Sequence, residues 1–318
     1  MSNKVLFDVD TGCDDATMLL TALADDGIDV AGVTTVFGNA PLEHTTRNTR
    51  AILEYVDRGE VPVAKGCARP FIEQNLDESP DDLAQIHGET GLTADLPAPE
   101  TVENALDDRH AARFMIDMAR EHDDLTIAAV GPQTNLALAL AMEPSLPEML
   151  EELYVMGGAA MVGGNVRPTA EFNFYQDPEA AARVLESGSV KMVGLDATEQ
   201  THIPLEEIET LADEGEHHRT FAGILDYYPE DSLDRYGYDG PVVHDSVVAA
   251  DLIDGVLQYE DHYVAVSTHD RLTAGQTVMD NRSVLGREPN TAVAVDIDVE
   301  RYQSIVLDRL RSLADAVT

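Results

Sequence analysis

Four carboxylates lie within eight residues near the start of the chain: Asp8, Asp10, Asp14 and Asp15. An apolar segment leads into Asp10, as in a strand rising out of a core, and Asp14 and Asp15 open an amphipathic stretch typical of a helix. A solvated acidic turn, stabilised by the helix dipole, would account for Asp14 and Asp15. It would not account for Asp10, whose carboxylate is repelled by the other two unless a cation lies between them. Clustered oxygen ligands suit Ca²⁺ or Mg²⁺, so we expect a metal site here.

Polar groups also follow the next expected strands. Asn39 comes after the apolar segment 28–36 and is equally typical of a turn residue and of a site residue. Val130 ends the segment 125–130, and the Gly-Pro pair behind it turns its backbone carbonyl outward, where a metal can bind it. Parallel sheets bind ligands at the carboxyl ends of their strands, so both positions support a site at that edge.

Later segments carry further candidate groups. Glu171 and Asn173 alternate along a segment that we expect to be extended, so both side chains would share one side of it and suit a sugar. His244 and Asp245 precede an apolar helix and diverge by roughly 100° around it, so one can serve a metal and the other a ligand. The alternative there is a capping Asp beside a bystander His. His87, on a long loop, can cover a ligand or lie on the surface.

These residues need a scaffold that brings them to one edge. The chain alternates apolar, β-branched segments with amphipathic ones, the pattern of a parallel sheet covered by helices. Expected strands are 5–10, 28–36, 61–64, 125–130, 153–156 and 190–195, and the segments 263–266, 272–280 and 291–297 are expected to form strands and turns. Expected helices are 16–24, 41–58, 104–121, 136–142, 204–228 (one or two helices), 247–253 and 301–314. We therefore expect an α/β fold, an open, mostly parallel, doubly wound sheet with helices on both faces, in a single domain spanning residues 1–318.

The composition limits the kinds of partner. The 318 residues include 60 Asp and Glu against 20 Lys and Arg, for a net charge of −40, and the acids are spread along the chain. Such a surface repels nucleic acids and anionic membranes, so we expect neither as a partner. Acidity of this extent is typical of proteins adapted to high salt, and we expect a halophilic source with a salt-loaded cytoplasm.

Compartment signals are consistent with that expectation. Cys13 and Cys67 are the only cysteines, and two thiols so far apart do not make a disulfide framework. No stretch approaches ~18 continuous apolar residues, and the chain enters its first strand without a basic and apolar leader. We therefore expect a cytoplasmic protein without a membrane span.

Taken in order, the motifs resemble those of the inosine-uridine nucleoside hydrolase family over nearly the whole chain. The opening Asp8-Val-Asp10-Thr-Gly-Cys-Asp14-Asp15 is similar to the family's acidic fingerprint. The later motifs that resemble the family's are Phe37-Gly38-Asn39, His87-Gly88, Gly131-Pro132, Thr134-Asn135, Met156-Gly157-Gly158, Gly164-Asn165, Glu171-Phe172-Asn173, His244-Asp245 and Leu272-Thr273. Thr11 and Ser246 stand where proline is common, and Ala274 where arginine is common. Each motif is short, and their combination in this order is specific.

The resemblance implies a Ca²⁺-dependent N-ribohydrolase that acts on nucleosides and forms a homodimer or homotetramer. The metal ligands that it implies are Asp10, Asp15, Asp245 and the carbonyl of Val130. The substrate-binding residues that it implies are Asp14, His87, Asn165, Glu171, Asn173 and Asp245. The candidate catalytic residues are Asp10, His244 and Asn39, and the resemblance places the last of these beside the attacking water.

The chemistry of N-glycosidic cleavage fits these residue types. The transition state is oxocarbenium-like, with positive charge on the sugar and negative charge on the leaving base. A metal lowers the pKa of its bound water, which attacks C1′ while Asp10 accepts the proton. His244 is the candidate acid for the leaving base, because imidazole titrates near neutral pH. The chain has no Trp, so base stacking would be provided by Tyr or Phe, and the choice between purines and pyrimidines stays open.

Two alternatives remain open at this point. Phe7-Asp8-Val-Asp10-Thr11 also resembles the start of haloacid-dehalogenase-type phosphatases, in which Asp8 would be the nucleophile and Mg²⁺ would assist. That motif wants Thr or Val where Gly12 stands, and a downstream lysine. The other alternative is a non-catalytic protein that binds calcium or ribose, and ligand binding without turnover would distinguish it.

Overall fold

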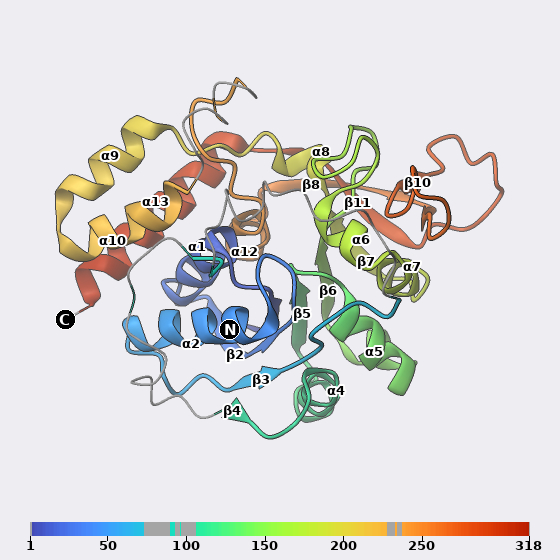
Figure 1. The fold of residues 1–318 in the computed structure, drawn as a ribbon, viewed down its shortest axis with the longest axis horizontal. Coiled ribbons are helices and arrows are strands. Elements are labelled where there is room, and N and C mark those ends of the chain that lie inside the picture. The colour runs from blue at the N-terminus through green and yellow to red at the C-terminus, as the bar shows by residue number, and fades with distance from the viewer. Residues whose placement is uncertain are drawn as a thin grey trace.

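The computed structural model describes residues 2–72, 90–92, 96, 106–227, 233 and 237–317. Among these residues nine strands form one sheet, in the order β4-β3-β2-β1-β5-β6-β7-β11-β8 (Figure 1). In that order the strands are Leu106–Asp107, Val63–Lys65, Ile28–Thr35, Asn3–Val9, Leu125–Ala129, Glu152–Met156, Val190–Val193, Thr291–Ile297 and Leu257–His262. Neighbouring strands pair in parallel, except that β8 runs antiparallel to β11. The expected open, mostly parallel sheet is confirmed.

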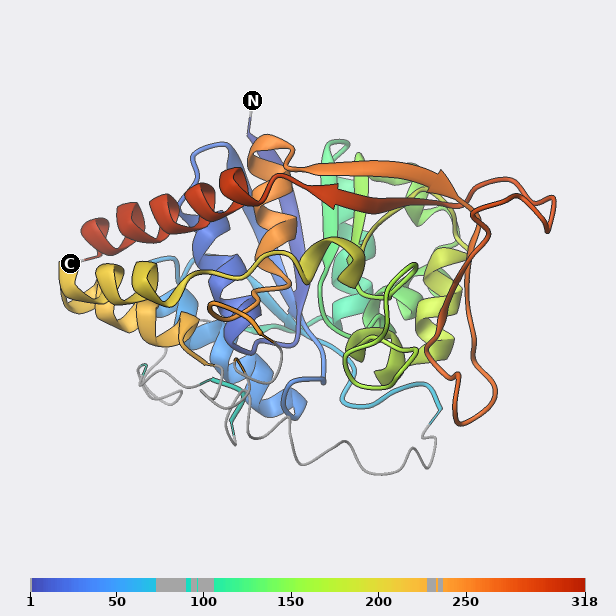
Figure 2. The same cartoon turned by 90° about the horizontal axis from the view of Figure 1, so that it is seen from above.

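Helices cover both faces of this sheet, as expected. The helices of one layer are α1 (Cys13–Leu23), α2 (Leu42–Tyr55), α10 (Glu216–Leu225), α12 (Ser246–Asp254) and α13 (Val299–Ala316). The helices of the other layer are α4 (Ala111–Glu121), α5 (Thr134–Met142) and α7 (Pro178–Leu185). Figures 1 and 2 show α9 (Leu205–Glu214), α10 and α13 together at one end of the molecule. No helix in the described ranges is long and apolar enough to cross a membrane.

The side-chain pattern of β1 explains why it lies at the centre of the sheet. Val5, Phe7 and Val9 point into one hydrophobic core and Leu6 into the other, and all four are fully buried. A strand buried on both faces has an almost continuous apolar sequence, as this one does up to its acidic end.

The carboxyl end of β1 is also where the topology changes direction. The chain runs from β1 outward through β2, β3 and β4, and then resumes on the other side of β1 with β5, β6 and β7. The crevice between the diverging connections is where open α/β sheets bind ligands. Asp10 follows β1 and Val130 follows β5, so both lie at this switch point.

One expected helix begins later than predicted, and one strand was not predicted. The helix expected over 104–121 begins at Ala111, because His110 caps it by accepting the Ala112 N–H and because residues 106–107 pair with β3 as strand β4. Strand β8 was not expected at all. It is an edge strand with exposed polar side chains on both sides, so its sequence lacks the apolar alternation of a buried strand.

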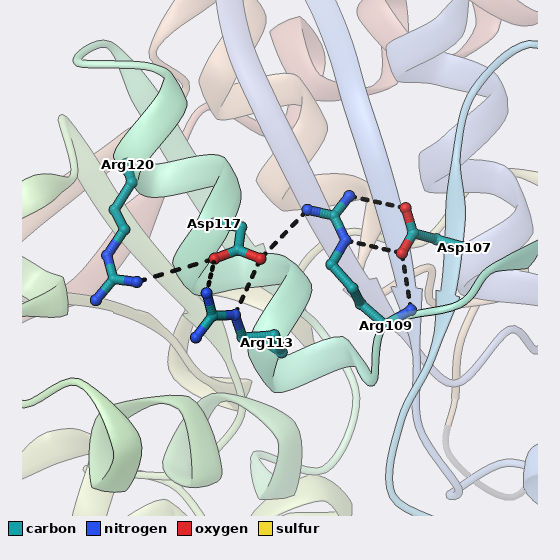
Figure 3. A network of polar contacts seen from close by, with 5 residues as sticks. All are labelled: Asp107, Arg109, Arg113, Asp117 and Arg120. Atoms are coloured by element: carbon teal, nitrogen blue, oxygen red, sulfur yellow. Dashed lines mark hydrogen bonds and ion pairs between the residues drawn. The ribbon is translucent and has the colours of Figure 1, made fainter.

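A network of charged side chains holds β4 against α4. Figure 3 shows Asp117 of α4 at the centre of three arginines, Arg109, Arg113 and Arg120. Arg109 also forms two side-chain hydrogen bonds with Asp107 of β4, at 2.7 and 2.8 Å. These groups are partly exposed, so each pair contributes roughly 0.2–1 kcal/mol and is weakened by salt. The network therefore makes a small contribution to keeping β4 beside α4.

Candidate functional site

The turn between β1 and α1 is held by the side chain of Asp15. Its Oδ1 accepts the backbone N–H of Asp10 at 3.0 Å, and its Oδ2 accepts that of Gly12 at 2.9 Å. These bonds satisfy donors at the start of α1, as acidic capping residues commonly do. The turn therefore presents Asp10 and Asp15 together at the end of the central strand.

Asn39 bridges these two carboxylates from the end of β2. Its backbone N–H donates to Asp10 Oδ2 at 2.6 Å, and its side-chain amide donates to Asp15 Oδ2 at 3.1 Å. The residue is therefore more than a turn former, because both of its donors are used on the acidic group. It fixes the position of Asp10 relative to Asp15.

Asp14, Asp15 and Asp245 form a buried acidic cluster. Carboxylate oxygens of Asp14, Asp15 and Asp245 all lie within 4.8 Å of one another, and the three residues are buried. Asp245 comes from the residue before α12, far from the others in sequence. Asp14 Oδ1 is buried and has no hydrogen-bond partner. A buried anionic oxygen without a donor is costly, so this oxygen is oriented for a ligand that carries positive charge or a donor.

Burial determines how readily the carboxylates of this cluster and the adjacent Asp10 ionise. Burial raises the pKa of Asp14 to about 6. Burial, followed by repulsion from neighbouring carboxylates, raises the pKa of Asp10 and of Asp245 well above the usual range. A hard divalent cation would offset both the cost of burying these negative charges and their mutual repulsion. An all-oxygen donor set suits Ca²⁺ or Mg²⁺. The residues present therefore fit a divalent cation.

The segment that carries Glu171 and Asn173 is helical, so the expected extended segment was wrong. Asn173 belongs to helix α6 (Phe172–Gln176), and Glu171 caps it by accepting the N–H groups of Asn173 and Phe174 at 2.8 and 3.1 Å. Burial raises the pKa of Glu171 to about 6. The Asn173 amide donates to the Val130 carbonyl at 2.6 Å. Capping thus places Asn173 at the end of β5, while Glu171 also accepts the Gly158 N–H at 2.8 Å just after β6 (Glu152–Met156), by a different route from the one expected.

The remaining predicted residues lie in different surroundings. Asn165 is exposed, and its Oδ1 accepts the N–H of Phe172 at 3.0 Å, so it closes the start of α6. His87 lies outside the described residues, so its predicted place near the ligand is untested. Asp8, the nucleophile of the phosphatase alternative, is fully buried, and its Oδ1 accepts from Thr34 and Asn135.

His244 has a partner that the sequence did not indicate. Its Nδ1 lies 2.8 Å from the hydroxyl of Thr198, which ends the short helix α8 (Leu195–Thr198) after β7. The signal that would have pointed to Thr198 is its place just after the carboxyl end of a parallel strand. His244 is partly buried and directly precedes Asp245 of the acidic cluster in the chain.

Comparison with known proteins finds relatives along the whole chain. The family model described as inosine-uridine preferring nucleoside hydrolase matches residues 5–304. The pyrimidine-specific ribonucleoside hydrolase RihA of Escherichia coli O1:K1 / APEC is 37% identical, over 99% of this chain and 100% of the relative. A purine-preferring ribonucleoside hydrolase from Gardnerella vaginalis superposes with a TM-score of 0.90 at 29% identity, over 98% of this chain and 99% of the other. This chain belongs to the inosine-uridine preferring nucleoside hydrolase family.

Proposed function

We propose that this ribonucleoside hydrolase depends on Ca²⁺, uses Asp10 as general base and uses His244 to protonate the leaving base. The observation that carries the proposal is the buried acidic group at the carboxyl end of β1, where Asn39 ties Asp10 to Asp15 and Asp15 meets Asp14 and Asp245. Charge of this density at a topological switch point supports a site for a cation and a polar ligand.

The proposed metal ligands are Asp10, Asp15, Asp245 and the Val130 carbonyl. A bound divalent cation would neutralise these carboxylates and make a nearby water easier to deprotonate. Asp10 is held by the Asn39 N–H and fully buried, so its carboxylate is fixed where it can accept a proton. Asn173 holds the Val130 carbonyl in place through its amide.

The remaining proposed roles concern the ribose and the base. The proposed ribose contacts are Asp14, Asn165, Glu171 and Asn173, with Asn39 beside the attacking water and His87 near the sugar or base. Binding the ribose hydroxyls orients C1′ for attack, and the surrounding carboxylates stabilise the positive charge that develops on the sugar. His244 donates a proton as the bond from C1′ to the base breaks.

The preferred base is a finer part of the proposal. The E. coli relative at 37% identity is named as pyrimidine-specific, whereas the Gardnerella structure at 29% identity is named as purine-preferring. We propose pyrimidine ribonucleosides as the better substrates, on the strength of the higher identity.

Ribose release from a panel of purine and pyrimidine nucleosides tests the proposal. The assay is run in molar KCl, because a chain of net charge −40 repels itself in dilute buffer, and with either Ca²⁺ or EDTA. Release that requires Ca²⁺ and is fastest from uridine or cytidine is the expected result. A folded, calcium-bound protein that releases no ribose from any nucleoside would instead be a binding protein.

The role of His244 predicts a dependence on the leaving group. His244→Ala is expected to slow hydrolysis of natural nucleosides by roughly 10²-fold or more, because general acid catalysis is worth that much. The loss should be much smaller for p-nitrophenyl riboside, whose leaving group needs little protonation. The measurement is kcat for both substrates, and equal losses on both would contradict the leaving-group role.

The close approach of Gly38 to Asp10 gives a second prediction. A Cβ added at Gly38 would lie 2.0 Å from Asp10 Oδ2, so Gly38→Ala must push the carboxylate aside. We expect kcat/KM for nucleosides to fall by roughly 10²-fold, the usual cost of misplacing a reacting group by about 1 Å. Gly223→Ala on α10 is the control, because a Cβ there meets nothing within 4 Å. Similar activity in both variants would argue against a fixed position for Asp10.

A further inference from the structure

We propose that Thr198 is a positioning residue for His244, which holds the ring by Nδ1 so that Nε2 is the nitrogen that serves the leaving base. The Thr198 hydroxyl lies 2.8 Å from Nδ1, and Thr198 is fully buried. Which nitrogen of a histidine does chemistry is set by the hydrogen bond that the other one makes. The inference rests on the proposed role of His244 in protonating the base.

Thr198 is itself held firmly. Its N–H donates to the Gly194 carbonyl at 3.1 Å, and its carbonyl accepts the N–H and the hydroxyl of Thr201 at 3.1 and 2.6 Å. The start of α8 has no room to shift, because a Cβ added at Gly194 would lie 2.7 Å from the Gly158 carbonyl oxygen. The Thr198 hydroxyl that contacts His244 is therefore carried by a backbone segment that is held in place after β7.

The backbone on which His244 is carried is also held, at the two residues before it. The Tyr227 hydroxyl donates to the Val242 carbonyl at 2.5 Å, and the Tyr302 hydroxyl donates to the Val243 carbonyl at 3.3 Å. Neither bond restricts rotation of the imidazole about its side-chain torsions. A hydroxyl suits that task, because it can either donate to Nδ1 or accept from an Nδ1–H.

The bond at Nδ1 fits the proposed step. As the C1′–N bond breaks, its electron pair goes to the base and a proton passes from His244 Nε2 to the base. Nδ1 keeps its hydrogen bond to Thr198 throughout, so the ring does not turn as it loses the proton. Thr198 does not touch the substrate, and its loss should therefore lower kcat and leave KM nearly unchanged.

The test compares Thr198→Val, Thr198→Ser and the control Thr21→Val, each with Ca²⁺ in molar KCl. Thr198→Val keeps the shape and loses the hydroxyl, and we expect kcat for uridine to fall roughly 5- to 20-fold, the loss expected from one hydrogen bond. On p-nitrophenyl riboside we expect a loss below about threefold. Thr198→Ser should restore most of the activity, even if the valine variant folds poorly. Thr21→Val on α1 removes a buried hydroxyl that bonds the Thr17 carbonyl at 2.8 Å, with no contact to Thr198 or His244, and should leave the ratio between substrates unchanged.

The outcomes separate this inference from the function on which it rests. If His244→Ala loses activity equally on both substrates, the leaving-group role fails and this inference fails with it. If His244→Ala discriminates between the substrates but Thr198→Val does not, the inference alone is overturned. In the double variant, Thr198→Val should add less than about twofold to the loss caused by His244→Ala, and a fully additive loss would also overturn it.

Discussion

Asp10→Asn is expected to lower kcat/KM for nucleoside hydrolysis by at least ~10³-fold while the protein stays folded. An amide has nearly the shape of the carboxylate but cannot accept a proton, and general base catalysis alone is worth about 10²–10⁴-fold. The variant also removes one negative charge from a proposed metal ligand. Because Asp10 is buried among repelling carboxylates, its neutral replacement should raise the Tm of the metal-free protein.

Measuring both kcat/KM and Tm distinguishes a loss of catalysis from a loss of structure. The matched control is Asp26→Asn, which removes the same charge from an exposed aspartate in the loop after α1. It should leave both kcat/KM and Tm close to those of the parent chain. If Asp10→Asn hydrolyses nucleosides within about tenfold of the parent rate, then Asp10 is not the general base.

The acidic stretch was predictable from the sequence because its parts are local. Asp10 follows one strand and Asp15 opens the next helix, so the turn alone brings them together. Alternation of strands and helices then fixed the edge of the sheet at which the turn lies. Asp245 joins the cluster from the start of a distant helix. The residue pattern left it open between a metal ligand and a helix cap, and the family resemblance favoured the ligand.

Other parts of the site depend on contacts that leave no periodic signal. Helix α6 spans only residues 172–176, too short for helical periodicity to show, and Glu171 specifies it by capping rather than by pattern. The bond between His244 and Thr198 joins positions 46 residues apart through tertiary packing. Strand β4 has two residues, and its pairing with β3 overrides the helical pattern that predicted a longer α4.

The buried carboxylates also make the stability of the metal-free protein depend on pH. A carboxyl whose pKa is raised on folding favours the folded state when protonated, so the stability that it gives is present at low pH and lost as pH rises through the folded pKa. Burial raises the pKa of Asp14 and of Glu171 to about 6, from ordinary values near 4. The loss should therefore fall mainly between about pH 4 and pH 7.

We therefore expect the EDTA-treated protein to melt at least ~5 °C lower at pH 7.5 than at pH 5.0, because several carboxylates that together contribute a few kcal/mol ionise in between. Saturating Ca²⁺ should raise the Tm at pH 7.5 more than at pH 5.0, because the cation binds the ionised cluster and competes with protons. Calorimetric melting in molar KCl, which screens the surface charge, measures both effects. Asp14→Asn should weaken the pH dependence, whereas Asp26→Asn should not. A Tm at pH 7.5 that does not respond to Ca²⁺ would mean that the cluster holds no cation.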